Sequence, residues 1–181
     1  IGKEAFYAYD IKAFNVSEEN DYFASKDGIL YNKDFTEIIY LPGRLEGEIT
    51  VPATVTNLGE YFPKPGIGNS EYDDPHDLVG CKVTAFNIEE GNADFVSEDG
   101  VLYDKDKTIL YYYPAAKEGE FFEVPSTVKT IGNAAFSANQ NLKRIFMHEN
   151  VEMIAICGFM GLTSLKSVTL NEGLRTIAIG A

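Results

Sequence analysis

The sequence has no tryptophan, only two cysteines and few basic residues, and two of these scarcities exclude whole classes of protein. Two cysteines exclude a disulfide scaffold and a cysteine-rich zinc site. The 15 Lys and Arg are outnumbered by 28 Asp and Glu, and the net charge of −13 would repel phosphate backbones, which argues against nucleic acid as a partner. No apolar run approaches the ~18 residues needed to cross a bilayer, so we expect no membrane insertion within this chain.

An internal repeat is the strongest feature that the sequence does have. Hydrophobic residues make up 45% of the 181 residues, enough for a packed core. In the C-terminal third, a V-x-x-I pattern returns at a constant step of 23 residues, at residues 128–131, 151–154 and 174–177. Phe136 returns at the same step as Phe159. A period of this length indicates a repeat architecture.

A longer repeat fills the first two-thirds of the chain. Residues 25–31 match residues 97–103 at an offset of 72, and residues 52–55 match residues 125–128 at an offset of 73. These matches predict long units at about 11–62 and 83–136, with 23-residue repeats from residue 128 onward. Each long unit contains an Asp-Gly pair, which favours a hairpin turn. We therefore expect inserted β-hairpins or meanders, with strands at 29–31, 38–40, 101–103 and 109–111.

A second pattern, L-x-x-I-x-L, begins at residues 11, 83, 142 and 165. It places three apolar side chains on one side of a short strand, and a single coil cannot bury that side alone. The sequence therefore predicts an α/β solenoid, a right-handed superhelix with short parallel strands on one face and short helices or turns on the other. Phe136 is expected to fill the interior, and residues 142–147 are expected to lie beside residues 165–170.

Residues 124–136 (VPSTVKTIGNAAF), followed by residues 142–145, resemble the BspA-like, or Treponema-type, leucine-rich repeat family. Its members often carry the S-x-D-G-x-L-Y…Y-P insertion found here at 25–42 and 97–114. The chain departs from the pattern where His148 and Asn171 replace the usual Pro. The resemblance implies secreted or surface-exposed bacterial proteins, often adhesins that bind host proteins or other cells, and it implies no enzyme activity.

The two ends of the sequence resemble interrupted repeats. Residues 1–6 match the I-G-x-x-A-F element of a repeat without its strand, and residues 177–181 match the same element cut before its Phe. We therefore interpret residues 1–181 as a single leucine-rich-repeat domain within a longer protein. The resemblance implies an extracellular or cell-surface location.

Signals for catalysis, cofactors and metals are weak. No Ser-His or Cys-His signature is present, so Cys81 and Cys157 are interpreted as packed, unpaired thiols. The carboxylates show no catalytic spacing and are interpreted as a solvated surface. The long loop at 63–80 contains Asp73, Asp74, His76 and Asp77, but it lacks the pattern of a calcium loop. We predict no catalytic residue, metal or cofactor, and leave cation binding by this loop as an alternative.

The outward positions of the predicted strands are the candidate binding surface. They are expected to align in two ladders across the coils, Ala13, Ala85, Arg144 and Ser167 in one, and Asn15, Asn87, Phe146 and Thr169 in the other. Aromatic and Arg side chains are favoured anchors of protein interfaces. Binding candidates are therefore Arg144, Phe146, Ser167, Thr169, Asn87 and Asn15. The alternative is that Phe146 packs on a neighbouring coil or hairpin.

Three functions stay open at this point. The first is a non-catalytic binding module of a bacterial surface or secreted protein, which engages a protein partner through the ladders. The second is a structural spacer without a ligand. The third is recognition of glycans by the aromatic rows at 111–113 and 121–122, although packing of these rings inside the meander is the other interpretation.

Overall fold

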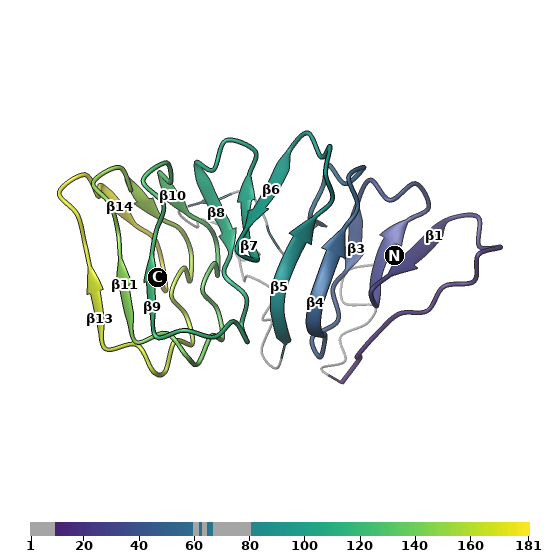
Figure 1. Ribbon diagram of the computed structural model, residues 1–181, viewed down its shortest axis with the longest axis horizontal. Coiled ribbons are helices and arrows are strands. Elements are labelled where there is room, and N and C mark those ends of the chain that lie inside the picture. Colours follow the sequence, from purple (N-terminus) through teal and green to yellow (C-terminus); the bar gives the residue numbers. More distant parts are fainter. Residues whose placement is uncertain (1–9, 60–61, 63–64, 67–80) are drawn as a thin grey trace.

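The computed structural model describes residues 10–59, 62, 65–66 and 81–181 (Figure 1). Short strands joined by turns make up these residues, and no α-helix is found among them. Of the two predicted alternatives for the second side of the coil, short helices or turns, the structure has turns. In the turns after residue 132, Ala134 and Ala138 have φ angles of 49° and 64°. Such left-handed residues interrupt a right-handed helix before it can propagate.

The two inserted meanders are confirmed. The first consists of β1 (Phe23–Lys26), β2 (Ile29–Asn32) and β3 (Ile38–Tyr40), and the second of β6 (Phe95–Glu98), β7 (Val101–Asp104) and β8 (Ile109–Tyr112). Both residues of each Asp-Gly pair have positive φ, 50° and 79° in the first turn and 49° and 74° in the second. This is the geometry that joins two twisted antiparallel strands in a two-residue turn.

Two rows of parallel strands follow the 23-residue step. One row is the sheet β13–β11–β9, formed by β9 (Phe121–Glu123), β11 (Arg144–Phe146) and β13 (Ser167–Thr169). Arg144 pairs with Ser167 and Phe146 with Thr169, which confirms that residues 142–147 lie beside residues 165–170. The second row consists of β10 (Thr130–Ile131), β12 (Met153–Ile154) and β14 (Thr176–Ile177).

The second row continues the meander of the second long unit. β10 pairs in parallel with β8, so the sheet has six strands in the order β14–β12–β10–β8–β7–β6. Each 23-residue step therefore adds one parallel strand to each of two sheets, and the strands succeed one another along the long axis of the molecule (Figure 1). The right hand of the superhelix stays a prediction.

A third parallel pair, β4 (Glu46–Val51) with β5 (Lys82–Ile88), is separated from the β13–β11–β9 sheet. The N–H of Phe86 donates to the carbonyl oxygen of Gly100 at 2.9 Å, and the N–H of Ile88 donates to Oγ of Ser97 at 3.0 Å. Alternate N–H groups of a strand point to opposite edges. The β6–β7 hairpin therefore occupies the edge of β5 that faces away from β4, and the two predicted continuous ladders are wrong.

The first predicted strand of the ladder is also absent. Residues 11–16 are not a strand, although the N–H of Phe14 donates to the carbonyl oxygen of Gly28 at 2.9 Å, as Phe86 does to Gly100. A strand of a sheet needs a second strand along its edge. Within the described part of the chain, these residues make only separate hydrogen bonds, to the β1–β2 hairpin and from the N–H of Arg44 to the carbonyl oxygen of Ile11, and no ladder forms.

Aromatic rings fill the interior of the stacked coils. Phe136 is fully buried, with its ring centroid 5.3 Å from that of Tyr113 and 5.4 Å from that of Phe159, which confirms its predicted place. In the preceding coils, the rings of Phe62, Phe86 and Tyr112 pack at centroid distances of 5.4–5.7 Å. The side chains of residues 111–113 are buried, which confirms that this row packs inside the molecule.

Two buried asparagines connect successive coils, and the sequence did not single them out. Asn139 donates through Nδ2 to the carbonyl oxygens of Pro114 and Lys117, and its Oδ1 accepts the N–H groups of residues 141 and 142. Asn92 makes the same four hydrogen bonds, to the carbonyl oxygens of Pro52 and Val55 and from the N–H groups of residues 94 and 95. These side chains satisfy backbone groups that turns leave unpaired.

Candidate functional site

The outward side chains of β9, β11 and β13 form one continuous surface, the β9–β11–β13 face. It consists of Phe121 and Glu123 on β9, Arg144 and Phe146 on β11, and Ser167 and Thr169 on β13. Successive side chains of a strand point to opposite sides. The central residues of the three strands, Phe122, Ile145 and Val168, therefore turn inward and pack against the core.

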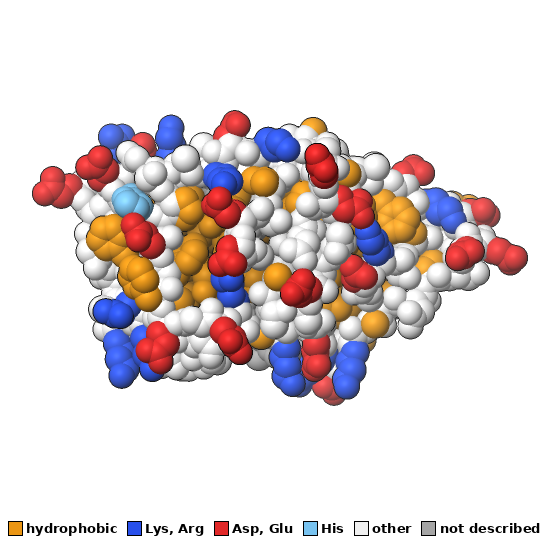
Figure 2. Space-filling view, in the orientation of Figure 1, with side chains coloured by type: hydrophobic (Ala, Val, Ile, Leu, Met, Phe, Trp, Pro, Cys, Tyr) orange, Lys and Arg blue, Asp and Glu red, His pale blue; other side chains and the backbone are white. Residues whose placement is uncertain are grey.

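Large apolar groups are exposed on this face. Phe121 is 50% exposed and Phe146 is 37% exposed, and Leu170, directly after β13, is 52% exposed. Figure 2 shows hydrophobic side chains gathered over the part of the molecule where Figure 1 places β9, β11 and β13, with Lys and Arg side chains along one edge. Aromatic side chains and Arg are enriched in protein interfaces, and polar groups surround them at the rim.

Arg144 lies between Phe121 and Ser167 in the register of the sheet. Its guanidinium carbon is 5.6 Å from the centroid of the Phe121 ring, a cation–π contact. Among the described residues, Arg144 forms no ion pair with a carboxylate, whereas the other two arginines do, Arg44 with Asp10 and Arg175 with Glu152. Its donors are therefore available to a carboxylate of another molecule.

Arg144 is one of three cations near the carboxylate of Glu120. A hydrogen bond and the charge of Lys143 lower the pKa of Glu120, and the charges of Lys166 and Arg144 lower it further. The N–H of Lys166 donates to the carbonyl oxygen of Lys143 at 2.8 Å, which keeps the two chain segments side by side. One end of the face therefore carries an excess of positive charge, although the whole chain is strongly acidic.

His148 supports the ring of Phe146. The two rings meet edge to face with centroids 5.4 Å apart, and Nε2 of His148 lies 2.9 Å from Oε1 of Glu123. The residue that replaces the family's usual Pro thus contacts both β9 and the exposed ring. Phe146 keeps 37% of its surface exposed, so this packing leaves part of the ring accessible.

The six predicted binding residues do not form one surface. Arg144, Phe146, Ser167 and Thr169 lie together on the β9–β11–β13 face. Asn87 lies on β5, where its Nδ2 donates to Oε2 of Glu48 at 3.2 Å, and Asn15 is exposed in the segment that is not a strand. The hairpin between β5 and β9 separates the two groups.

Phe121, Glu123 and His148 were missed as members of the site, although a signal for β9 exists in the sequence. The match between residues 52–55 and 125–128 extends backwards, so that residues 48–51 (EITV) correspond to residues 121–124 (FFEV). At the 23-residue step, residues 121–124 also correspond to residues 144–147 (RIFM). Both alignments predict a strand that ends before Pro125. The pair Phe121–Phe122 therefore belongs to a parallel sheet and not to the meander.

No activated nucleophile or metal cluster is found in the described residues. Cys81 lines a cavity of about 600 Å³ with Lys82, Ala115 and Met160, among others, and burial raises the pKa of its thiol to about 11. A protonated thiol is a poor nucleophile. Cys157, expected to be buried, is half-buried, and both cysteines are free.

Within the described ranges, no group of three or more His, Cys, Asp or Glu side chains could hold a metal ion. Asp73, Asp74, His76 and Asp77 of the candidate cation loop lie outside these ranges, as do residues 1–6. The described residues contain no helix that is long and apolar enough to cross a membrane.

Comparison with known proteins identifies the repeat. A family model described as BspA type leucine rich repeat region matches residues 111–181 in six copies. No curated protein matches the chain. The crystal structure of the pneumococcal vaccine antigen PcpA is 30% identical, with a TM-score of 0.60 over 72% of this chain and 28% of that chain.

Two further crystal structures share the fold. A leucine-rich repeat protein from Eubacterium ventriosum is 29% identical, with a TM-score of 0.58 over 78% of this chain and 38% of that chain. A leucine rich cell surface protein from Faecalibacterium prausnitzii is 22% identical, with a TM-score of 0.50 over 78% of this chain and 40% of that chain, and shows the fold alone. The chain therefore spans between 28% and 40% of the length of the three structures.

Proposed function

We propose, from the premise that residues 111–181 of this chain are BspA-type leucine-rich repeats, that it is a non-catalytic protein-binding module of a bacterial cell-surface or secreted protein. The binding surface is the β9–β11–β13 face. One observation carries this proposal. Phe121 and Phe146 are exposed beside Arg144, Phe121 as its register partner on β9 and Phe146 two residues along β11, and Arg144 has no carboxylate partner among the described residues.

The physical argument rests on the cost of exposing such groups. Exposure of aromatic rings to water is unfavourable in free energy, and a partner that covers them removes that apolar surface from water. A carboxylate from the partner would pair with Arg144 at a partly desolvated site, where such a hydrogen bond is strong. Ser167 and Thr169 add hydroxyl groups at the neighbouring strand for further hydrogen bonds.

The location at the cell surface is supported by similarity. One of the similar structures is a leucine rich cell surface protein, and another is a pneumococcal vaccine antigen. The acidic surface of the chain also suits a protein that stays soluble outside the cell.

The test is a binding assay on immobilised protein with a panel of extracellular matrix proteins and with washed bacterial cells. The double variant Arg144→Ala/Phe146→Ala should bind about ten-fold or more weakly than the wild type, because both anchors are removed. The matched control is Glu48→Ala/Asn87→Ala on the β4–β5 sheet, which should bind as the wild type does. Absence of binding by the wild type to every probe, or equal binding by both variants, would sink the proposal.

A structural spacer is the second candidate function, and the same assay separates the two. If the parent protein binds the probes equally well with and without the two substitutions, the spacer is favoured. Recognition of glycans has less support, because the tyrosine row at 111–113 is buried and offers no platform for a sugar ring.

A further inference from the structure

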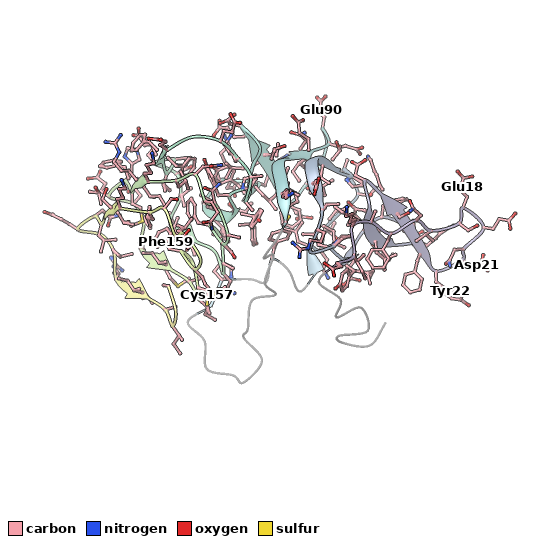
Figure 3. The ribbon with its side chains drawn as sticks, turned by 90° about the horizontal axis from the view of Figure 1, so that it is seen from below. Glu18, Asp21, Tyr22, Glu90, Cys157 and Phe159 are labelled. Carbon is pink, nitrogen blue, oxygen red and sulfur yellow. The ribbon has the colours of Figure 1, made fainter. Side chains whose placement is uncertain are left out.

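A second exposed aromatic group lies at the opposite end of the molecule from the β9–β11–β13 face. Tyr22, directly before β1, is 76% exposed, the largest exposure of any large hydrophobic side chain in the described residues. Figure 3 shows Glu18 and Asp21 beside it at the end of the molecule, and Glu19 is exposed as well. We name residues 17–22 the acidic turn.

Comparison of the two long units shows that packing does not require this tyrosine. At the repeat offset of 72, Tyr22 corresponds to Asp94, and the same turn precedes β6 in the second unit. Asn20 holds the first turn as Asn92 holds the second, through hydrogen bonds of 2.9 Å from the N–H groups of Tyr22 and Phe23 to its Oδ1. A polar residue therefore suffices at this position, and the exposed ring of Tyr22 is available to bind another molecule.

The acidic turn is held by hydrogen bonds and carries an excess of negative charge. Nζ of Lys33 donates to the backbone carbonyl oxygens of Glu18 and Asn20, so this cation is engaged by the backbone of the turn. The carboxylates of Glu18, Glu19 and Asp21 form no ion pair with any other described residue. A preorganised turn of this kind loses little conformational entropy when it binds.

The acidic turn and the β9–β11–β13 face are complementary. The face offers exposed aromatic rings beside a cluster of three cations around Glu120, and the turn offers an exposed ring beside three carboxylates and one cation. β1 and β13 lie at opposite ends of the longest axis (Figure 1), so the two surfaces of one molecule are far apart. They can meet only between two copies.

We propose that the β9–β11–β13 face binds the acidic turn of a second copy of this chain. The inference rests on the proposed function of the face as a protein-binding surface, and it names the partner. Tyr22 packs against Phe121 and Phe146, and the carboxylates of the turn pair with Arg144 and Lys166. Because the two surfaces differ, the contact is heterologous and repeats head to tail into open chains of molecules. So small a contact gives weak association, with a dissociation constant on the order of 100 μM.

Sedimentation velocity on the purified chain, from low micromolar to near-millimolar concentration, tests this inference. The average mass of the wild type should rise with concentration, and salt should suppress the rise because charge pairs contribute. Tyr22→Ala and Arg144→Glu should each weaken association about ten-fold or more. The matched controls Asp94→Ala and Asn87→Ala should associate as the wild type does.

Mixing the two inactive variants gives the sharpest outcome. Tyr22→Ala keeps an intact face, and Arg144→Glu keeps an intact turn, so an equimolar mixture should form dimers but nothing larger, while each variant alone stays monomeric. A wild type that is monomeric at every concentration overturns the inference. Association that survives in Tyr22→Ala but is lost in Ile179→Asp also overturns it, because Ile179, 69% exposed, would then be the contact.

Failure here and failure of the proposed function are distinguishable. If the wild type does not self-associate but binds matrix proteins or cells through Arg144 and Phe146, only the identity of the partner is wrong. If the substitutions on the face change neither binding to the probes nor self-association, both proposals are wrong. Circular dichroism and thermal unfolding of each variant establish that it is folded before either assay is interpreted.

Discussion

The β4–β5 pair and the β13–β11–β9 sheet are both built from parallel strands of stacked repeats, yet their outward sides differ. On β4–β5, Glu46 pairs with Lys82 at 3.5 Å, and Glu48 accepts a hydrogen bond from Asn87, so the polar groups satisfy one another. On the other sheet, aromatic rings are exposed and Arg144 lacks a carboxylate partner among the described residues. The same backbone arrangement thus supports a self-satisfied surface in one place and an interactive one in another.

The β6–β7 hairpin explains why the two surfaces are independent. It takes the edge of β5 that would otherwise pair with β9, through the carbonyl oxygen of Gly100 and Oγ of Ser97. Residues of the two sheets therefore share no hydrogen-bonded ladder. An insertion in a repeat protein can in this way divide one extended surface into separate patches.

The largest predicted effect concerns the asparagines that both halves share. Asn139→Ala and Asn92→Ala should each lower the free energy of unfolding by about 2–4 kcal/mol, because each leaves buried backbone groups without partners. Urea unfolding followed by circular dichroism measures both. Similar losses would show that the two halves are held by the same device. A loss confined to one variant would mean that the halves differ in their cores as well as in their surfaces.

The control for this comparison is Asn141→Ala in the same turn. Asn141 donates through Nδ2 to the carbonyl oxygen of Lys117 at 3.0 Å, but its side chain is exposed, so water can replace it. Its substitution should change the free energy of unfolding by less than about 1 kcal/mol.

Alkaline unfolding probes the buried tyrosines behind the two faces. Burial raises the pKa of Tyr113 to about 12, and burial also raises the pKa of Tyr31 in the first unit. The folded state therefore retains these protons longer than the unfolded state. The stabilisation that results from this pKa shift is fully present below pH 10 and is lost as the pH rises from 10 through 12. For Tyr113 it amounts to about 2–3 kcal/mol. Tyr113→Phe should raise the alkaline unfolding midpoint measured by circular dichroism, and an unchanged midpoint would contradict the prediction.

The repeat determines how much of this architecture can be read from the sequence. Both meanders and the pairing of β11 with β13 could be predicted because Asp-Gly turns and a constant 23-residue step are local signals. The separation of the sheets could not, because it depends on which edge of β5 the hairpin occupies, a tertiary fact. Arg144 and Phe146 were identified from their outward positions, whereas Phe121 was not, because Gly119 stands where Leu142 begins the L-x-x-I-x-L pattern one repeat later.

Gly100 tests whether the hairpin really presses on β5. A Cβ at Gly100 would lie 2.7 Å from Cβ of Ala85, whereas a Cβ at Gly47 on β4 would meet nothing within 4 Å. Both glycines have positive φ, 74° and 84°, so both substitutions to Ala share the backbone strain. Gly100→Ala should therefore cost about 1–2 kcal/mol more than Gly47→Ala in urea unfolding. Equal losses in the free energy of unfolding would show that the hairpin moves away from β5 without destabilising the protein.

The smallest effect compares two exposed carboxylates, one beside each sheet. A hydrogen bond from Lys26 lowers the pKa of Glu89 from its usual 4.5, and a hydrogen bond from Lys143 lowers that of Glu120. A lowered folded pKa means that the stabilisation is present above pH 4.5 and is lost as the pH falls through the folded value. An NMR titration of the two carboxyl groups should show both pKa values rising toward 4.5 in Lys26→Met and Lys143→Met, respectively.

What remains of each shift in these variants separates the two surfaces. Glu89 still accepts the N–H of Ala53, a hydrogen bond that salt hardly screens, whereas Glu120 retains only the charges of Lys166 and Arg144. Added salt should therefore remove the remaining shift of Glu120 and leave most of that of Glu89, because screening acts on exposed charges. If the shift of Glu120 resists salt, Arg144 and Lys166 do not act on it as free surface charges, and the cationic end of the β9–β11–β13 face is weaker than its geometry indicates.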